Sequence, residues 1–201
     1  MKKDVKILNK AVMYHGFFKM EKYCLQHTLF EGGWSGEMSR ELFVRGNCVA
    51  VVLYDPERDD VVLIEQFRVG AIEDAINTPW LIEIVAGIME ENETPQEVAI
   101  RESFEEAGCV VEKLIPINTL YLSPGGSSEK ISLFCGIVKS EHVGGIHGVA
   151  HEHEDIFVRT SSFSEAYQMV LRNEIDSAIP IIALQWLALH RFELDKFSIN
   201  L

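Results

Sequence analysis

Three glutamates at helical spacing are the residues of this chain best suited to chemistry. Glu102, Glu105 and Glu106 lie three and four residues apart, so on one helix their carboxylates converge. Carboxylate oxygens are hard ligands that suit Mg²⁺ or Mn²⁺. Residues 83–112 hold nine acidic residues and a single base, Arg101, so repulsion favours a bound cation. Spacing alone also allows the alternative, an acidic helix face that contacts only solvent.

The helix that carries these glutamates has sequence signals at both ends. Thr94 is a favourable N-cap, Pro95 suits the first helical position, and Glu97 completes a capping box. Gly108 is a typical C-terminal stop. We therefore expect a helix from about Pro95 to Ala107.

Helical periodicity divides this segment into two faces. Ile100, Phe104 and Ala107 fall on one face. The three glutamates cluster on the opposite face. We therefore expect an apolar face and an acidic face on opposite sides of this helix.

The elements around the helix indicate a mixed α/β or α+β fold, with helices packed on a mixed sheet. Apolar and alternating segments bounded by turn residues predict the strands, and two further helices are expected near the C-terminus. The expected strands are 6–12, 17–28, 38–45, 49–54, 61–67, 81–86, 115–122, 131–138 and 156–159, and the helices are 164–172 and 178–192. We expect residues 1–46 to form a separate β-rich unit and residues 47–201 the main domain.

Composition argues against several classes of protein. Of the 201 residues, 47% are hydrophobic and 24% charged, which is typical of a soluble globular protein. The net charge is −13, so we expect no binding to nucleic acid or to an anionic membrane, since both need a basic face. Residues 1–5 lack the apolar core of a signal peptide, and the four cysteines are scattered. These features favour a cytoplasmic protein.

The segment from Gly87 to Cys109 resembles the signature of the Nudix hydrolase family, GX5EX7REUXEEXGU, in which U is a bulky apolar residue. Every glycine, glutamate and arginine position of the signature matches. Ser103 and Cys109 depart from the two U positions because both are small, which concerns packing beneath the helix more than chemistry. The resemblance implies an α/β/α sandwich that cleaves a nucleoside diphosphate linked to another group.

The resemblance also implies a role for each polar residue of the signature. Mg²⁺, with Mn²⁺ as a substitute, would bind Glu102, Glu105 and Glu106, together with the main-chain carbonyl of Ala86. Glu105 and Arg101 are thereby expected in the catalytic machinery. Glu93 and Arg101 would form a supporting pair that orients the ligands.

From about Phe17 to His190 the chain further resembles the bacterial ADP-ribose pyrophosphatase branch of that family. Pro124, in the turn that begins at Ser123, follows Cys109 by fifteen residues, a spacing that marks this branch. The resemblance implies hydrolysis of ADP-ribose to AMP and ribose 5-phosphate. One alternative is a GDP-mannose or other nucleotide-sugar pyrophosphatase of the same family. An alternative of another class is a non-catalytic nucleotide-ligand sensor.

Residues 144–156 form a polar, glycine-containing segment that is a plausible mobile lid. By resemblance, Glu152 is the first choice for the base that activates the attacking water. Glu154 is an additional metal ligand or the alternative base. Four histidines, His142, His147, His151 and His153, lie in or beside this segment; their spacing matches no standard zinc pattern, and their role stays open.

The same resemblance implies contacts with the substrate. Arg40 and Arg68 match phosphate-binding positions, although either could be a surface ion pair. Phe17 matches an aromatic that stacks on adenine from the partner subunit of a homodimer with exchanged N-terminal units, although it could equally be a packed aromatic. Ser123 and Glu129 complete the expected contacts, with Glu129 reaching a ribose hydroxyl.

Overall fold

The computed structural model describes residues 2–74 and 78–194, apart from the side chain of Glu152. The chain divides into two compact units. The first unit comprises residues 1–47 and 121–130, and the second comprises residues 48–120 and 131–201. The N-terminal unit therefore includes a segment that lies far away in the sequence.

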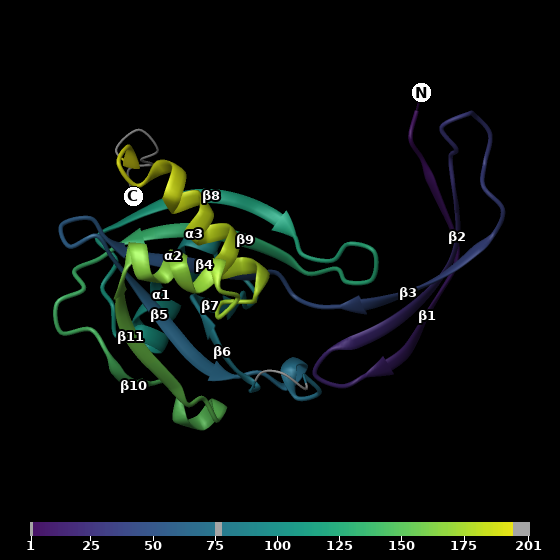
Figure 1. Cartoon of the computed structure of the whole chain (residues 1–201). Helices are drawn as coiled ribbons and strands as arrows, with labels where there is room; N and C mark the ends of the chain where they lie inside the picture. Colours follow the sequence, from purple (N-terminus) through teal and green to yellow (C-terminus); the bar gives the residue numbers. More distant parts are fainter. Residues whose placement is uncertain (1, 75–77, 195–201) are drawn as a thin grey trace. The chain divides into compact units, whose positions relative to one another are not determined.

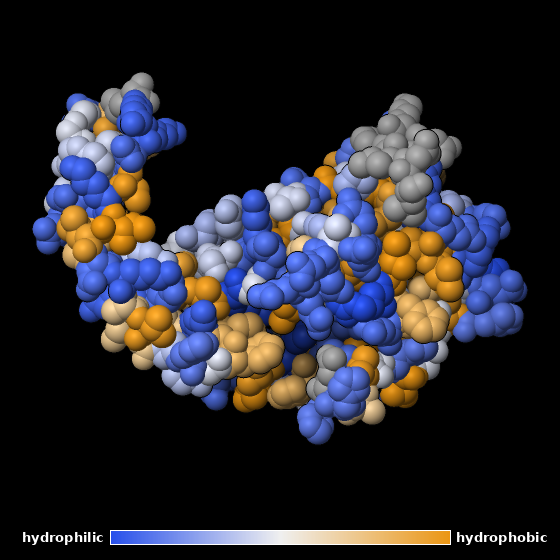
Figure 2. Space-filling model, turned by 180° about the vertical axis from the view of Figure 1, so that it is seen from behind, coloured by the Kyte–Doolittle hydropathy of each residue, from blue (hydrophilic) through white to orange (hydrophobic). Residues whose placement is uncertain are grey.

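The first unit is built on a three-stranded antiparallel sheet in the order β1-β2-β3 (Figure 1). Its strands are β1 (Val5–His15), β2 (Lys19–His27) and β3 (Met38–Val44), which confirms the three strands predicted here. Segment 121–130 bonds to β3: the Phe43 N–H donates to the Gly126 carbonyl at 2.8 Å. Every residue of β1 is exposed, and Figure 2 shows apolar side chains on the surface of this unit.

The second unit contains a mixed sheet with the strand order β10-β11-β5-β4-β9-β8. β4 and β9 are parallel, whereas β4–β5, β5–β11 and β10–β11 are antiparallel. The strands are β4 (Cys48–Asp55), β5 (Asp60–Phe67), β6 (Trp80–Glu83), β7 (Val85–Ile88), β8 (Lys113–Tyr121), β9 (Lys130–Ile137), β10 (Gly145–His147) and β11 (Ile156–Ser162).

The single strand predicted at 81–86 is two strands in the structure. β6 pairs with β5, and β7 pairs with β4, so the chain passes from one neighbour to the next at Ile84. Ile84 is 2% exposed, and neither a glycine nor a proline marks the change of partner in the sequence around it. This change places Ala86 and Gly87 beside the helix that follows.

Helices cover both faces of this sheet, which confirms the predicted α/β/α sandwich. α1 (Pro95–Ala107) packs on one face, and α2 (Phe163–Leu171) and α3 (Ala178–His190) pack together on the other (Figure 1). Two short 3₁₀ turns lie at Val69–Ala71 and Ala150–Glu152. Within the described ranges, no helix is long and apolar enough to cross a membrane.

The ends of α1 are as predicted, but the face with Ile100 and Phe104 is not the face that the helix buries. Thr94 and Glu97 form the capping box, and Gly108 ends the helix with a left-handed φ of 65°. Ile100 and Phe104, however, are 41% and 63% exposed. The buried positions of α1 are Val98, Ala99, Ser103, Glu106 and Ala107. These mostly small side chains let α1 lie close to β4 and β7, and the larger apolar ones face outward.

Candidate functional site

The structure buries one of the three expected metal-binding carboxylates. Glu106 is 2% exposed, and its Oε2 accepts a hydrogen bond from the Ala86 N–H at 2.9 Å. Burial, together with the negative charges of Glu102 and Glu154, raises the pKa of Glu106 to about 8 in spite of this hydrogen bond. A cation bound beside Glu106 would stabilise its ionised form.

Arg101 holds the other two expected metal-binding carboxylates, those of Glu102 and Glu105. Its Nη1 donates to Glu102 Oε1 at 2.8 Å and to Glu105 Oε2 at 2.9 Å. Its Nε and Nη2 donate to the two oxygens of Glu93 at 3.0 and 3.2 Å, so the predicted Glu93–Arg101 pair is present. The hydrogen bond to Glu93 contributes most to raising the Arg101 pKa, which keeps the guanidinium charged.

Gly87 provides the space that the Glu102 carboxylate occupies. A Cβ atom at position 87 would overlap that carboxylate, so a residue with a side chain would displace it. Burial raises the pKa of Glu102, and the charges of Glu105 and Glu154 act in the same direction. β7 thus brings the glycine that lets a partly buried carboxylate lie beside Glu106.

The chemistry of this cluster fits a hard divalent cation, since its side-chain ligands are carboxylate oxygens. The raised pKa values of Glu102 and Glu106 show that their negative charges are destabilised where no cation is bound. Among residues 2–74 and 78–194, no group of three or more His, Cys, Asp or Glu side chains is gathered closely enough to hold a metal ion. Arg101 binds Glu102 and Glu105, while the Ala86 N–H binds Glu106. The carbonyl of Ala86 stays a predicted ligand.

The segment predicted as a lid is tied to α1 by its backbone. The Gly148 N–H donates to the Glu105 carbonyl at 3.4 Å. Glu154 Oε2 accepts from the Val149 N–H at 3.1 Å, and its charge contributes to the raised pKa values of Glu102 and Glu106. The side chain of Glu152 lies outside the described part of the chain, so its role as the base stays a prediction.

Arg68 reaches the site from the end of β5. Its Nε lies 2.6 Å from Glu83 Oε2, and its positive charge counteracts the rise in the Glu106 pKa. Glu83 was not among the predicted site residues, although it interrupts an apolar segment in the sequence. An acidic residue within a short apolar strand is the signal that could have identified it.

Phe17 and Arg40 belong to the first unit. Phe17 is 86% exposed, and its ring lies edge-on to that of Phe18 at 4.7 Å. Arg40 is exposed on β3, and its Nη1 donates to the Ser39 carbonyl at 2.8 Å. The structure therefore leaves both side chains accessible, and their roles toward a substrate stay predictions.

Ser123 and Glu129 lie in the segment of the first unit that bonds to β3. Ser123 is exposed, and its carbonyl accepts from the Ser127 N–H at 2.9 Å. Glu129 is 9% exposed, and its Oε1 lies 3.2 Å from Arg45 Nη1. The Glu129 carboxylate is therefore already paired, which limits how freely it could turn toward a ribose hydroxyl.

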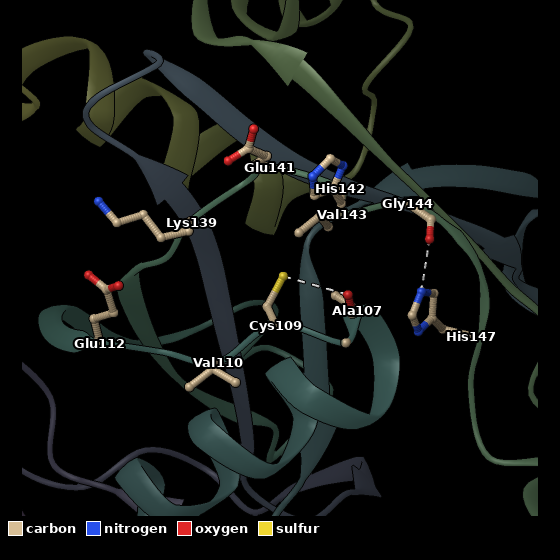
Figure 3. A pocket seen from close by; sticks show the side chains of 11 residues that line it. Ala107, Cys109, Val110, Glu112, Lys139, Glu141, His142, Val143, Gly144 and His147 are labelled. Carbon is tan, nitrogen blue, oxygen red and sulfur yellow. Dashed lines mark hydrogen bonds between the residues drawn. The ribbon is translucent and has the colours of Figure 1, made fainter.

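A separate hollow of about 330 Å³ lies at the C-terminal end of α1 (Figure 3). It contains none of the predicted site residues. Two of the four histidines line it: His142, and His147, whose Nε2 lies 3.1 Å from the Gly144 carbonyl. The rest of the lining is Ala107, Gly108, Cys109, Val110, Glu112, Lys139, Glu141, Val143 and Gly144.

Comparison with known proteins places this geometry in a family. The sequence matches the NUDIX domain over residues 44–199. It is 47% identical over 189 residues to a protein of Escherichia coli (strain K12) named ADP-ribose pyrophosphatase, covering 94% of this chain and 90% of that one. A protein of the same name from Haemophilus influenzae is 44% identical over 195 residues, covering 96% and 90%.

Two more distant proteins are also similar to this chain. A GDP-mannose pyrophosphatase of Yersinia pestis is 32% identical over 176 residues, covering 88% of this chain and 87% of that one. A solved structure described as an ADP compounds hydrolase aligns with a TM-score of 0.69 at 19% identity, over 93% of this chain and 96% of that one, and shares the fold. Because the domain match and the similar sequences span most of its length, this chain belongs to the Nudix family.

Proposed function

We propose that this protein is a metal-dependent ADP-ribose pyrophosphatase, which hydrolyses ADP-ribose to AMP and ribose 5-phosphate. The observation that carries the proposal is the buried Glu106 carboxylate beside Glu102 on the α1 face, with Arg101 holding the neighbouring acids. Carboxylates with perturbed pKa values cluster at functional sites, and a bound cation would stabilise their ionised forms. The 47% identity to a protein named ADP-ribose pyrophosphatase supports the choice of substrate.

In the proposed site, Glu102, Glu105, Glu106 and the Ala86 carbonyl hold Mg²⁺ or Mn²⁺, with Glu154 as a further ligand. When bound, the cation neutralises charge on the diphosphate and lowers the pKa of a water molecule. Arg101 keeps two of the carboxylates in place through the hydrogen bonds described above.

The remaining groups of the chain bind the substrate and move the proton. Glu152, or alternatively Glu154, accepts the proton of the attacking water. As the new oxygen–phosphorus bond forms, the bond from that phosphorus to the bridging oxygen of the diphosphate breaks. Arg68 and Arg40 bind phosphate oxygens, since guanidinium groups donate in pairs to such oxygens.

The same proposal includes a homodimer formed through the N-terminal unit, with Phe17 stacking on the adenine bound by the partner subunit. β1 is an edge strand whose eleven residues are all exposed, including Ile7 at 57%, Val12 at 56% and Tyr14 at 66%. Exposed apolar side chains on an edge strand favour association with another chain. Light scattering coupled to size-exclusion chromatography should give twice the 22.8 kDa chain mass; a monomer at micromolar concentration would contradict this part.

The test of the activity is hydrolysis of a substrate panel with identified products. ADP-ribose should give AMP and ribose 5-phosphate in Mg²⁺, faster than GDP-mannose, ADP-glucose or NADH. Glu105→Gln and Glu106→Gln should lower the rate far more than Glu152→Gln if the metal ligands contribute most. Hydrolysis of none of these compounds would contradict the proposal and favour a ligand sensor.

GDP-mannose is the second candidate substrate because a GDP-mannose pyrophosphatase is 32% identical over most of this chain. Its diphosphate would use the same carboxylates on α1, and only the contacts with base and sugar would differ. A preference for GDP-mannose in the panel would keep the metal chemistry and overturn the assignment of ADP-ribose.

A further inference from the structure

Gln66, on β5, buries an amide group that nothing in the described protein satisfies. The residue is 7% exposed, and among the described residues its Nε2 has no hydrogen-bond partner. A buried polar group without a partner costs about 1–3 kcal/mol. Proteins retain few such groups, and each one calls for an explanation such as a ligand.

The backbone directs Gln66 toward the carboxylate site. Side chains alternate along a strand, so Ile64, Gln66 and Arg68 share one face. Arg68 keeps the extended conformation, with φ of −127° and ψ of 112°, and its N–H donates to the Pro79 carbonyl at 2.7 Å. The alternation therefore continues through Arg68.

The two neighbours of Gln66 on this face mark the border of the site. Ile64 is 0% exposed and belongs to the core beneath α1. Arg68 is paired with Glu83 and acts electrostatically on Glu106. Gln66 thus lies between the apolar core under α1 and the charged groups of the site.

The nearby protein groups do not supply an acceptor for this amide. Gln66 pairs across the ladder with Leu81, whose side chain has no polar atom. Glu83 accepts from Arg68, Glu106 accepts from the Ala86 N–H, and neither carboxylate accepts from the Gln66 amide. Because the unsatisfied atom is a donor, its ligand must present an acceptor. The oxygens of a diphosphate meet this need and also suit the guanidinium two residues along β5.

We propose that Gln66 is a substrate-binding residue whose side-chain N–H donates a hydrogen bond to a diphosphate oxygen of the substrate. The inference deepens the proposed pyrophosphatase function and rests on it. It adds to the arginines and carboxylates a neutral donor that binds the part common to all nucleoside diphosphate sugars.

The first test compares Gln66→Met, of similar size, with the wild type. Loss of a hydrogen bond to a charged acceptor should lower kcat/KM for ADP-ribose roughly 10- to 100-fold. The thermal unfolding midpoint should stay the same or rise, because an unsatisfied amide is removed. Gln168→Met is the matched control, since Gln168 is exposed on α2, and it should change neither quantity.

Two results of this comparison would overturn the inference. One is a kcat/KM of Gln66→Met within twofold of the wild type. The other is a lower unfolding midpoint with unchanged kcat/KM per folded molecule, which is the result expected of a purely structural residue. Gln66→Glu, which keeps the length and removes the donor, should lose at least as much activity as Gln66→Met.

A second test asks which part of the substrate Gln66 binds. The fold-loss in Gln66→Met should be the same for ADP-ribose and ADP-glucose, because both contain the same diphosphate. A loss confined to one of them would place Gln66 on the sugar and overturn the inference. Calorimetric titration with the inert analogue α,β-methylene-ADP-ribose in Mg²⁺ should show at least tenfold weaker binding to Gln66→Met.

The two proposals can fail separately. If the wild type prefers another nucleotide sugar, the assignment of ADP-ribose fails. The kcat/KM values of Gln66→Met and the wild type are then compared with that nucleotide sugar as the substrate, and Gln66→Met should show the same fold-loss. If the wild type hydrolyses ADP-ribose and Gln66→Met is unimpaired, only the inference about Gln66 fails.

Discussion

The helices on the two faces of the central sheet bury different kinds of side chain. On the α1 face, Glu106 and Ser103 are buried among apolar residues, and β5 contributes Gln66. On the opposite face, α2 and α3 bury only apolar residues: Phe163, Ala166, Pro180, Ala183, Leu184 and Leu187.

We infer from this difference that the α1 face serves the reaction and that the α2–α3 face mainly stabilises the fold. A buried carboxyl group lowers stability unless it is neutral or paired, and strongly perturbed groups of this kind cluster at functional sites. The α2–α3 face contributes hydrophobic burial in proportion to the apolar area it removes from water. Changes on the α1 face should therefore alter activity, and changes on the other face should alter stability.

The largest effect is expected from Glu106→Gln. Loss of a metal-binding carboxylate should lower kcat/KM for ADP-ribose on the order of 10³-fold, since metal ions contribute several kcal/mol of transition-state stabilisation. The free energy of unfolding of the metal-free protein at about pH 8 should not fall, because a destabilised acid is removed. Steady-state kinetics and urea unfolding measure the two quantities. A loss of both kcat/KM and the free energy of unfolding would contradict the proposed difference between the two faces.

Leu184→Ala tests the opposite face. Leu184 is 0% exposed in the core between α3 and the sheet, so its truncation should lower the free energy of unfolding by about 2–5 kcal/mol. At a temperature where the variant is folded, its kcat/KM should remain within about threefold of the wild type, because a core truncation removes no contact with the substrate. A large loss of activity in a folded Leu184→Ala protein would show that the two faces are coupled.

The metal-free protein should lose stability as the pH rises. Burial raises the pKa of Glu106 from 4.5 to about 8, so between these values the folded state holds a proton that the unfolded state releases. This contribution is fully present below the unfolded pKa and is lost as the pH rises through about 8. Urea unfolding in a chelator should show a fall of roughly 2 kcal/mol between about pH 6 and pH 8. Glu106→Gln is the control and should lack most of this fall.

A smaller loss of activity than that of Glu106→Gln is expected from Arg101→Lys. A lysine keeps the charge but cannot hold Glu93, Glu102 and Glu105 together through a planar fork. Groups that orient metal ligands typically contribute 10- to 100-fold, so kcat/KM should fall by about that factor. Arg172→Lys, at an exposed ion pair that follows α2, should leave the kinetics unchanged. Equal kcat/KM values for Arg101→Lys and the wild type would show that Arg101 does not position the metal-binding carboxylates.

Features encoded by neighbouring residues could be predicted from the sequence. The capping box at Thr94, the stop at Gly108 and the helix between them depend on contacts within a few residues, and all three are confirmed. The three N-terminal strands are confirmed in the same way. The Glu93–Arg101 ion pair, also present, came from the family signature, because eight residues of separation give no local signal.

Features set by distant partners could not be predicted. The buried face of α1 depends on how closely the helix approaches β4 and β7, so the apolar Ile100 and Phe104 were misleading. The change of strand at Ile84 depends on which neighbours are free to pair. The importance of Gln66 appears only in the structure, where its side-chain Nε2 is buried without a hydrogen-bond partner among the described residues.

The role of the buried Glu106 carboxylate is tested most directly by the Mg²⁺ dependence of ADP-ribose hydrolysis, measured for the wild type and for Glu106→Gln. If Glu106 binds the catalytic cation, Mg²⁺ should activate the wild type saturably, a chelator should leave almost no turnover, and Glu106→Gln should show little activation. Substantial turnover without metal, or the same Mg²⁺ dependence in both proteins, would contradict the claim that the buried carboxylate of α1 serves the chemistry.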